Sequence, residues 1–135
     1  SWPAQEGMPT LRALPSLLFE PAHAPYLSEL SMSGHSLSAV DATNPPFSAH
    51  LFVRLAAVSL RGNGLRAVPA GLLALPSLET CDLGVNEIGE LPAELRADAL
   101  PQLSVLVLES NLLTTLPAAL FALPCLATLD VRANP

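Results

Sequence analysis

Apolar residues recur along the second part of the chain at a fixed interval. From Leu55 onward the pattern L-x-x-L-x-L-x-x-N-x-L-x-x-L-P-x-x-L-x-x-L-P-x repeats, and its units begin at Leu55, Leu78, Leu103 and Leu126. The steps between these starts are 23, 25 and 23 residues. A period of this length is typical of a solenoid, in which each short unit covers the apolar face of the next.

The first half of each unit predicts a short strand followed by a turn. Two apolar residues stand two positions apart, as in Val58 and Leu60, and this alternation is the pattern of a strand with one buried face. An asparagine then follows at the same phase in every unit: Asn63, Asn86, Asn111 and Asn134. Because a carboxamide both accepts and donates hydrogen bonds, we expect these side chains to form a ladder that satisfies the backbone of neighbouring turns.

The second half of each unit predicts a loop or a short helical turn. It carries a Leu-Pro or Val-Pro pair, as in Val68-Pro69 and Leu91-Pro92, and proline cannot donate to a strand ladder. The middle unit is two residues longer than its neighbours. Its residues 93–100 favour helix and predict about two helical turns there.

These residues resemble the leucine-rich repeat family, in its short 23-residue LP-containing subclass (SHOC-like or SDS-like, intracellular). The resemblance implies an α/β fold. It would be a curved, right-handed solenoid with a parallel β-sheet on the concave face and short helical turns or loops on the convex face. Residues 27–135 would form the solenoid, with units starting near residues 27, 55, 78, 103 and 126.

The two ends of the chain depart from the regular repeat. Residues 1–26 are interpreted as a lead-in and a half-repeat cap. The first unit is degenerate, with His35 at the asparagine phase, and turn residues gather in 41–50, which predicts a loop insert on the return side. The last unit stops at Asn134-Pro135, so we expect an open C-terminal end.

Composition narrows the classes of partner and the compartment. The net charge is −6, and all six basic residues are arginines, which argues against nucleic acid and against anionic membranes. No apolar run is long enough to span a bilayer. Cys81 and Cys125 belong about two repeats apart, beyond disulfide reach, and no Asn-x-Ser/Thr acceptor occurs. These absences favour an intracellular location, in the cytoplasm or in an organelle or cytoskeletal assembly.

No catalytic or cofactor-binding pattern stands out. His23, His35 and His50 have spacings unlike any metal-ligand signature. No Gly-Lys-Ser/Thr phosphate loop and no nucleophile elbow occur. We therefore predict no enzymatic activity, no metal and no cofactor.

The variable strand positions predict where a partner binds. They point away from the core and form rows across the units, with Val105 and Val107 at the centre and charged residues on either side. An apolar centre with charged flanks is typical of a modest protein interface. The candidate partner-binding residues are Ser59, Arg61, Asp82, Val105, Val107, Glu109, Asp130 and Arg132.

Several readings of this surface stay open. The leading hypothesis is a non-catalytic module that binds a protein partner through the concave strand face. The same rows are also compatible with a merely solvated sheet, and binding could use the end around Leu129, Val131 and Pro135. The chain could equally be a structural subunit of a large stable assembly, such as a ciliary or ribosomal complex. It could also be the recognition arm of a larger enzyme, such as a ubiquitin ligase, kinase or phosphatase complex.

Overall fold

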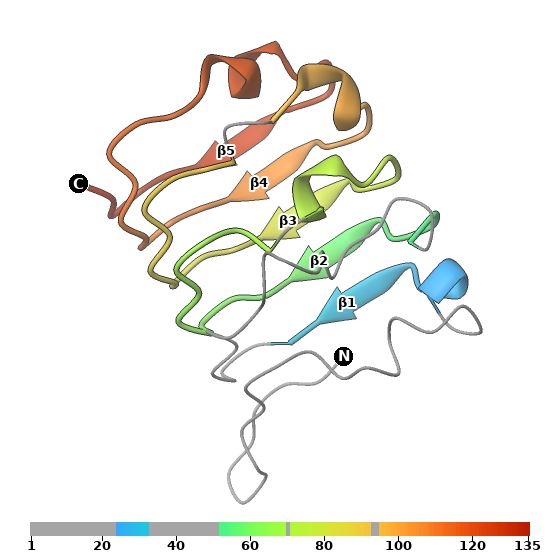
Figure 1. The fold of residues 1–135 in the computed structure, drawn as a ribbon, viewed down its shortest axis with the longest axis horizontal. Helices are drawn as coiled ribbons and strands as arrows, with labels where there is room; N and C mark the ends of the chain where they lie inside the picture. Colours follow the sequence, from blue (N-terminus) through green and yellow to red (C-terminus); the bar gives the residue numbers. More distant parts are fainter. Residues whose placement is uncertain (1–23, 33–51, 70, 93–94) are drawn as a thin grey trace, which may run out of the picture.

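The computed structural model describes residues 24–32, 52–69, 71–92 and 95–135. Five strands form one parallel sheet in chain order (Figure 1). Each strand has three residues: β1 (Glu29–Ser31), β2 (Ala57–Ser59), β3 (Thr80–Asp82), β4 (Val105–Val107) and β5 (Thr128–Asp130). Every unit contributes one strand and stacks on the unit before it. The predicted architecture, a solenoid with one parallel sheet, is confirmed.

The strands pair in the register of the repeat. Residues at the same phase face one another, so that the middle residues of the five strands form a single row beneath the sheet: Leu30, Val58, Cys81, Leu106 and Leu129. The first four members of this row are buried. The residues before and after them point to the other face, as the period of two requires.

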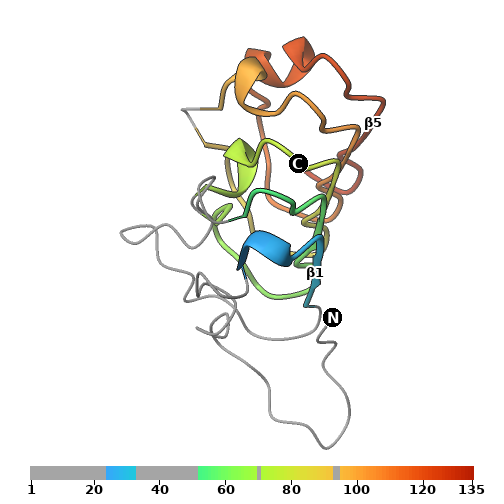
Figure 2. The same cartoon turned by 90° about the vertical axis from the view of Figure 1, so that its right-hand side faces the viewer.

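The return paths carry short 3₁₀ helices. They are η2 (Ala24–Tyr26), η3 (Leu72–Ala74), η4 (Ala97–Ala99) and η5 (Ala118–Ala122). Seen from the edge of the sheet, η3, η4 and η5 lie off one face only (Figure 2). The buried leucines of the core pack between these helices and the strands. No described element covers the other face.

The predicted two turns of helix over 93–100 are wrong. Helix η4 holds three residues, and Arg96 before it is extended, with φ −127° and ψ 140°. This helix belongs to the return path of the middle unit. A helix of three residues is too short to recover the free-energy cost of nucleation. Tertiary context therefore overrides local helix propensity in this unit.

The core is complete in the middle of the stack and thinner at β5. The leucines that open the middle units, Leu55, Leu78 and Leu103, are fully buried. Their counterparts around β5 are partly buried, namely Leu126, Leu129 and Val131. Most of residues 1–26, the segment 41–50 and all three histidines, His35 among them, lie outside the described residues.

The asparagines tie each turn to the turn before it. The side-chain oxygen of Asn86 accepts the backbone N–H groups of Asn63 and Leu65, each at 3.0 Å. Its nitrogen donates to the carbonyl oxygens of Leu60 (3.1 Å), Leu83 (2.9 Å) and Gly84 (3.1 Å).

The other asparagines repeat these bonds one unit along. The oxygens of Asn111 and Asn134 accept the N–H groups of Ile88 (3.1 Å) and Leu113 (2.9 Å). Asn63 donates to the carbonyl of Met32 at 2.7 Å. Its own oxygen has no hydrogen-bond partner among the described residues.

The residue before each asparagine adopts the left-handed conformation. The φ angles are 70° at Gly62, 52° at Val85, 55° at Ser110 and 57° at Ala133. Glycine reaches this region without strain, whereas a β-branched residue such as valine pays a steric cost. The turn thus imposes one backbone shape on four different residues.

Candidate functional site

The outward rows of the sheet lie where the repeat pattern predicts them. One row is Glu29, Ala57, Thr80, Val105 and Thr128. The next is Ser31, Ser59, Asp82, Val107 and Asp130. Arg61, Gly84, Glu109 and Arg132 follow two residues after the second row. We call these three rows together the concave face.

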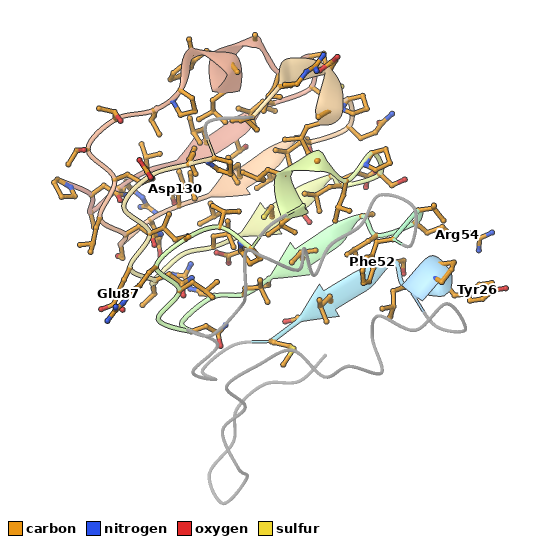
Figure 3. All side chains as sticks on the ribbon, in the orientation of Figure 1. Tyr26, Phe52, Arg54, Glu87 and Asp130 are labelled. Carbon is orange, nitrogen blue, oxygen red and sulfur yellow. The ribbon has the colours of Figure 1, made fainter. Side chains whose placement is uncertain are left out.

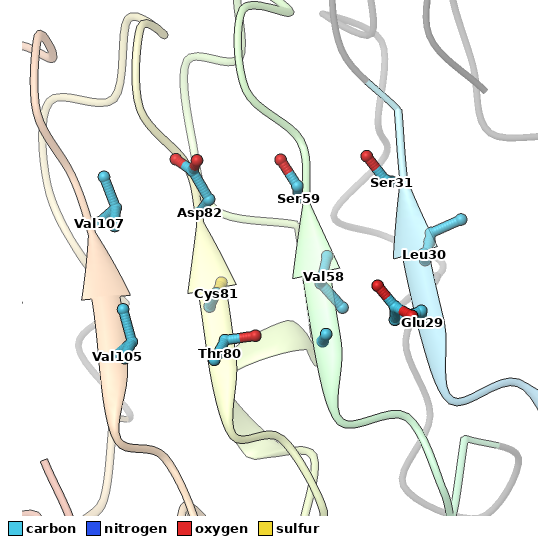
Figure 4. Close-up of a pocket in the computed structure, with 11 residues that line it drawn as sticks. Glu29, Leu30, Ser31, Val58, Ser59, Thr80, Cys81, Asp82, Val105 and Val107 are labelled. Atoms are coloured by element: carbon cyan, nitrogen blue, oxygen red, sulfur yellow. The ribbon is translucent and has the colours of Figure 1, made fainter. Parts of the chain in front are cut away.

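A hollow of about 330 Å³ opens on the concave face over β1 to β4. Small side chains, including Ala57 and Ser59 on β2, form its centre, and Val105 and Val107 on β4 form one side (Figure 4). Both valines are part-exposed. The hollow exists because the repeat demands large residues only on the inward face and leaves the outward positions free to be small.

Five charged side chains form a chain of ion pairs beside this hollow. Arg61 Nη1 lies 3.3 Å from Asp82 Oδ1, and Arg61 Nη2 contacts Glu109. Arg132 Nη2 lies 3.1 Å from Glu109 Oε2 and 2.8 Å from Asp130 Oδ2. Glu109 therefore stands between the two arginines and joins residues that lie 48 and 23 positions away in sequence.

Gly84 leaves the space that this chain of ion pairs uses. A Cβ atom at Gly84 would lie 2.3 Å from Arg61 Nη1. Because glycine has no side chain, the Arg61 guanidinium can cross the unit of β3 and reach Glu109 in the unit of β4. A glycine at a variable position thus decides where a long side chain of the neighbouring unit lies.

The ion pairs favour the charged forms of Arg61, Asp130 and Arg132. The hydrogen bond to Glu109 raises the pKa of Arg61, and that to Asp130 raises the pKa of Arg132. Hydrogen bonds from the side chain and backbone N–H of Arg132 lower the pKa of Asp130. Three carboxylates and two guanidiniums leave this group with a net charge of −1.

The two cysteines lie in different surroundings. Burial raises the pKa of the Cys81 thiol to about 12, so the thiol that underlies the hollow stays protonated at neutral pH. Cys125 is exposed, and neither cysteine is in a disulfide. No cluster of histidine, cysteine, aspartate or glutamate in the described ranges could hold a metal ion.

Among the described residues, none of the helices has the length and apolar character that crossing a membrane requires.

The predicted partner-binding residues divide into two groups. Ser59, Asp82, Val105 and Val107 line the hollow. Arg61, Glu109, Asp130 and Arg132 lie beside it and are paired with one another. Asp82 belongs to both groups, because it lines the hollow and contacts Arg61.

Four residues of the hollow that belong to the outward rows are missing from the predicted site: Glu29, Ser31, Ala57 and Thr80. The signal that could have found them is the register, since they occupy the same rows as the predicted residues. Small side chains and the degenerate first unit give these positions no pattern that is typical of an interface in the sequence.

Comparison with known proteins agrees with the fold. Residues 76–135 match the family model described as leucine rich repeat. No curated protein matches the chain. Leucine-rich repeat domains generally mediate protein–protein interaction and are typically non-catalytic. The matched segment contains β3, β4 and β5, and it is leucine-rich repeat both in sequence and in structure.

Proposed function

We propose that this chain is a non-catalytic module that binds a protein partner on its concave face. The observation that carries the proposal is the hollow over β1 to β4, which no described element fills or covers. It joins apolar surface at Val105 and Val107 with hydroxyl groups that can donate and accept hydrogen bonds, such as those of Ser59 and Thr80. Both are needed for a specific interface.

The neighbouring ion pairs support the same surface. Arg61 and Arg132 are held by carboxylates in defined positions rather than free in solvent. Charges fixed in this way steer a partner and set its orientation more than they add affinity. The paired residues would thus form a rim, and the hollow would make the closest contacts.

The remaining parts of the proposal rest on the sequence. Residues 27–135 would form the solenoid and residues 1–26 its cap. The Leu-Pro pairs favour the short LP-containing subclass, and the absence of a disulfide framework favours an intracellular protein. The acidic, lysine-free composition favours a protein partner over nucleic acid or a membrane.

A second candidate, a subunit of a large assembly, is favoured by the surface at β5. A separate hollow of about 320 Å³ is lined there by Leu113, Leu116 and Val131, among others. Val131 and Leu129 are partly exposed, unlike their counterparts in earlier units. Another protein packed on this surface would complete their burial. A recognition arm of a larger enzyme would use the concave face and differ only in what is attached to it.

One set of substitutions distinguishes the two surfaces. Val107→Arg places a long cation in the hollow, and Val131→Arg does so at β5. Val53→Arg is the control, because Val53 is exposed and lines neither hollow. Proteins captured from a lysate on each immobilised variant are compared by quantitative mass spectrometry, after thermal unfolding has shown that all variants fold.

The concave-face proposal expects one outcome. The set of proteins lost with Val107→Arg should be retained with Val53→Arg and Val131→Arg. Loss with Val131→Arg alone would favour the assembly subunit instead. Equal capture by wild type and Val107→Arg would refute binding through the concave face.

A further inference from the structure

We infer that the partner segment held on the concave face presents a basic side chain to the hollow over β1 to β4, with small apolar side chains beside it. This inference rests on the proposed function and specifies the chemistry of the partner. It follows from the charge, the shape and the surroundings of the hollow.

The charged residues that line the hollow are carboxylates. They are Glu29 on β1 and Asp82 on β3, and no arginine is among the lining residues. Glu29 is exposed, and it has no ion-pair partner within the described residues. A cation brought into the hollow would therefore meet at least one carboxylate that has not been neutralised.

Asp82 also retains acceptor capacity. Its Oδ1 atom takes the Arg61 guanidinium at 3.3 Å and the Gly84 N–H at 2.9 Å. No group in the described part of the chain bonds its Oδ2 atom. A carboxylate has about four lone-pair sites, so Asp82 can accept a further hydrogen bond from an incoming cation without releasing Arg61.

The floor of the hollow leaves room between the two carboxylates. They belong to strands two apart and to rows two residues apart along the strand, so roughly 12 Å of sheet separates them, at about 4.8 Å per strand and 3.3 Å per residue. Ala57 and Ser59 on the intervening strand β2 have small side chains. Figure 4 shows Glu29 and Asp82 on the strands either side of the one that carries Ser59. A lysine or arginine head lying over β2 would sit between the carboxylates and beside the Ser59 hydroxyl.

The surrounding charge also favours a basic segment. The ion-paired group has a net charge of −1, from Asp82, Glu109 and Asp130 against Arg61 and Arg132. Adding Glu29 makes the described concave face −2, within a chain of net charge −6. Such a surface raises the local concentration of cations and repels anions. An acidic segment would meet this net negative charge and would find no arginine among the residues that line the hollow.

The size and the apolar wall define the rest of the segment. A volume of about 330 Å³ is near the lower end of the range of small ligand sites, about 300–1,000 Å³. It suits one or two side chains of an extended segment rather than a folded element. Val105 and Val107 offer apolar contact at the β4 end, where a neighbouring alanine, valine or threonine of the partner would pack.

Selection from a random peptide library on the whole chain tests this inference. Phage-displayed random heptapeptides are selected on the immobilised wild-type chain, and the affinities of the enriched peptides are then measured in solution by fluorescence polarisation. We expect enrichment of lysine or arginine next to small apolar residues. Binding should weaken as salt rises, because exposed charge pairs are screened.

Two double substitutions that remove equal charge provide the decisive comparison. Glu29→Gln with Asp82→Asn removes the carboxylates of the hollow. Glu87→Gln with Asp98→Asn is the control, since both residues are exposed and lie outside the hollow (Glu87 is labelled in Figure 3). The first pair should weaken the enriched peptides at least about tenfold, as expected for the loss of a close charge pair. The control pair should leave them nearly unchanged.

The outcomes separate this inference from the proposed function. Peptides without a basic residue that bind wild type and the Glu29/Asp82 variant alike, but not Val107→Arg, would overturn the basic segment and keep the concave site. Peptides that bind Val107→Arg as well as wild type would overturn both. Enrichment of no sequence over the bare support would overturn the claim that a short basic segment suffices.

Discussion

Two polar rows run side by side across this stack, and they are built in opposite ways. The asparagine row, Asn63, Asn86 and Asn111 with Asn134 after them, is almost fully buried over its first three members and bonds the backbone. The charged row contains Arg61, Glu109 and Arg132. It is part-exposed, and its side chains form ion pairs with one another. Polar side chains that satisfy backbone groups hold the fold together. Polar side chains that form hydrogen bonds with one another do not support the backbone. They can be replaced by other residues without changing the fold, so these positions are available for recognition.

Their energies differ for the same reason. Removing a buried hydrogen-bonding side chain leaves its partner groups with no hydrogen bond, because water cannot reach them. Each such unsatisfied group lowers the stability by about 1–3 kcal/mol. An exposed ion pair contributes about 0.2–1 kcal/mol and is screened by salt. The side chain of Arg132 is 79% exposed, whereas Asn111 is 3% exposed. This difference predicts that substitutions in the asparagine row lower the free energy of unfolding much more than substitutions in the charged row.

Asn86→Ala should have the largest effect. It removes five hydrogen bonds and leaves buried donors and acceptors from two neighbouring turns unpaired. We expect a loss of at least about 4 kcal/mol in the free energy of unfolding, measured by urea denaturation of the whole chain. Such a loss is large compared with the total stability of most domains.

Asn134→Ala is the control for this prediction. Asn134 makes the same kinds of bond but is only part-buried, so water can replace part of what is lost. We expect about half the effect of Asn86→Ala. Equal losses of unfolding free energy at Asn86 and Asn134 would show that burial does not determine how much each asparagine stabilises the fold.

Val85→Asn should raise stability. Val85 holds a left-handed backbone with φ 52°, a conformation that costs an L-residue about 1–2 kcal/mol and that asparagine tolerates better. Its side chain is 47% exposed, so little packing is lost. We expect the free energy of unfolding to rise by about 1 kcal/mol. Gly62→Val, at the same phase with φ 70°, should lower it by a similar amount. A fall with Val85→Asn would show that the valine contributes packing that outweighs the strain.

Gly84→Ala tests the placement of Arg61 with a smaller expected effect. The added methyl group would displace the guanidinium from Glu109 and Asp82, which should lower stability by about 0.5–1 kcal/mol. Gly89→Ala is the control, because nothing lies within 4 Å of a Cβ there. It should be neutral or stabilising by about 0.4–1 kcal/mol. Thermal unfolding of both variants in low and high salt measures the difference, which should shrink in high salt.

The sequence predicts the buried row far better than the exposed one. The strands, their register and the phase of the asparagines follow from the repeat, because every unit must present the same residue types to the same core. The left-handed conformation at Val85 does not follow, since three of the four residues at that phase are not glycine. Nor does the brevity of η4, since local propensity alone favours a longer helix there.

The candidate site was predictable as a set of rows but not as a shape. Repeat phase places Val107 beside Asp82. It does not show that Arg61 reaches Glu109, because that contact depends on a missing side chain at Gly84. Nor does it show that the hollow extends to Glu29, since the hollow arises from small residues at variable positions. Variable positions carry no periodic signal, and their arrangement has to be seen in three dimensions.

The smallest effect concerns the pH dependence that separates the two rows. Hydrogen bonds from Arg132 hold the pKa of Asp130 below its ordinary value. A carboxyl whose pKa is lower in the folded state stabilises the fold above its unfolded pKa, about 3.9 for aspartate. That contribution is lost as the pH falls through the folded pKa. Carbon-13 NMR titration of the Asp130 carboxyl should therefore give a lowered pKa in the wild type and one nearer the ordinary value in Arg132→Gln. An unchanged pKa in the variant would show that Arg132 does not hold Asp130 in solution. Carboxamides do not titrate, so the bonds made by Asn86 should be unaffected over this range, and acid should loosen the charged row before the asparagine row.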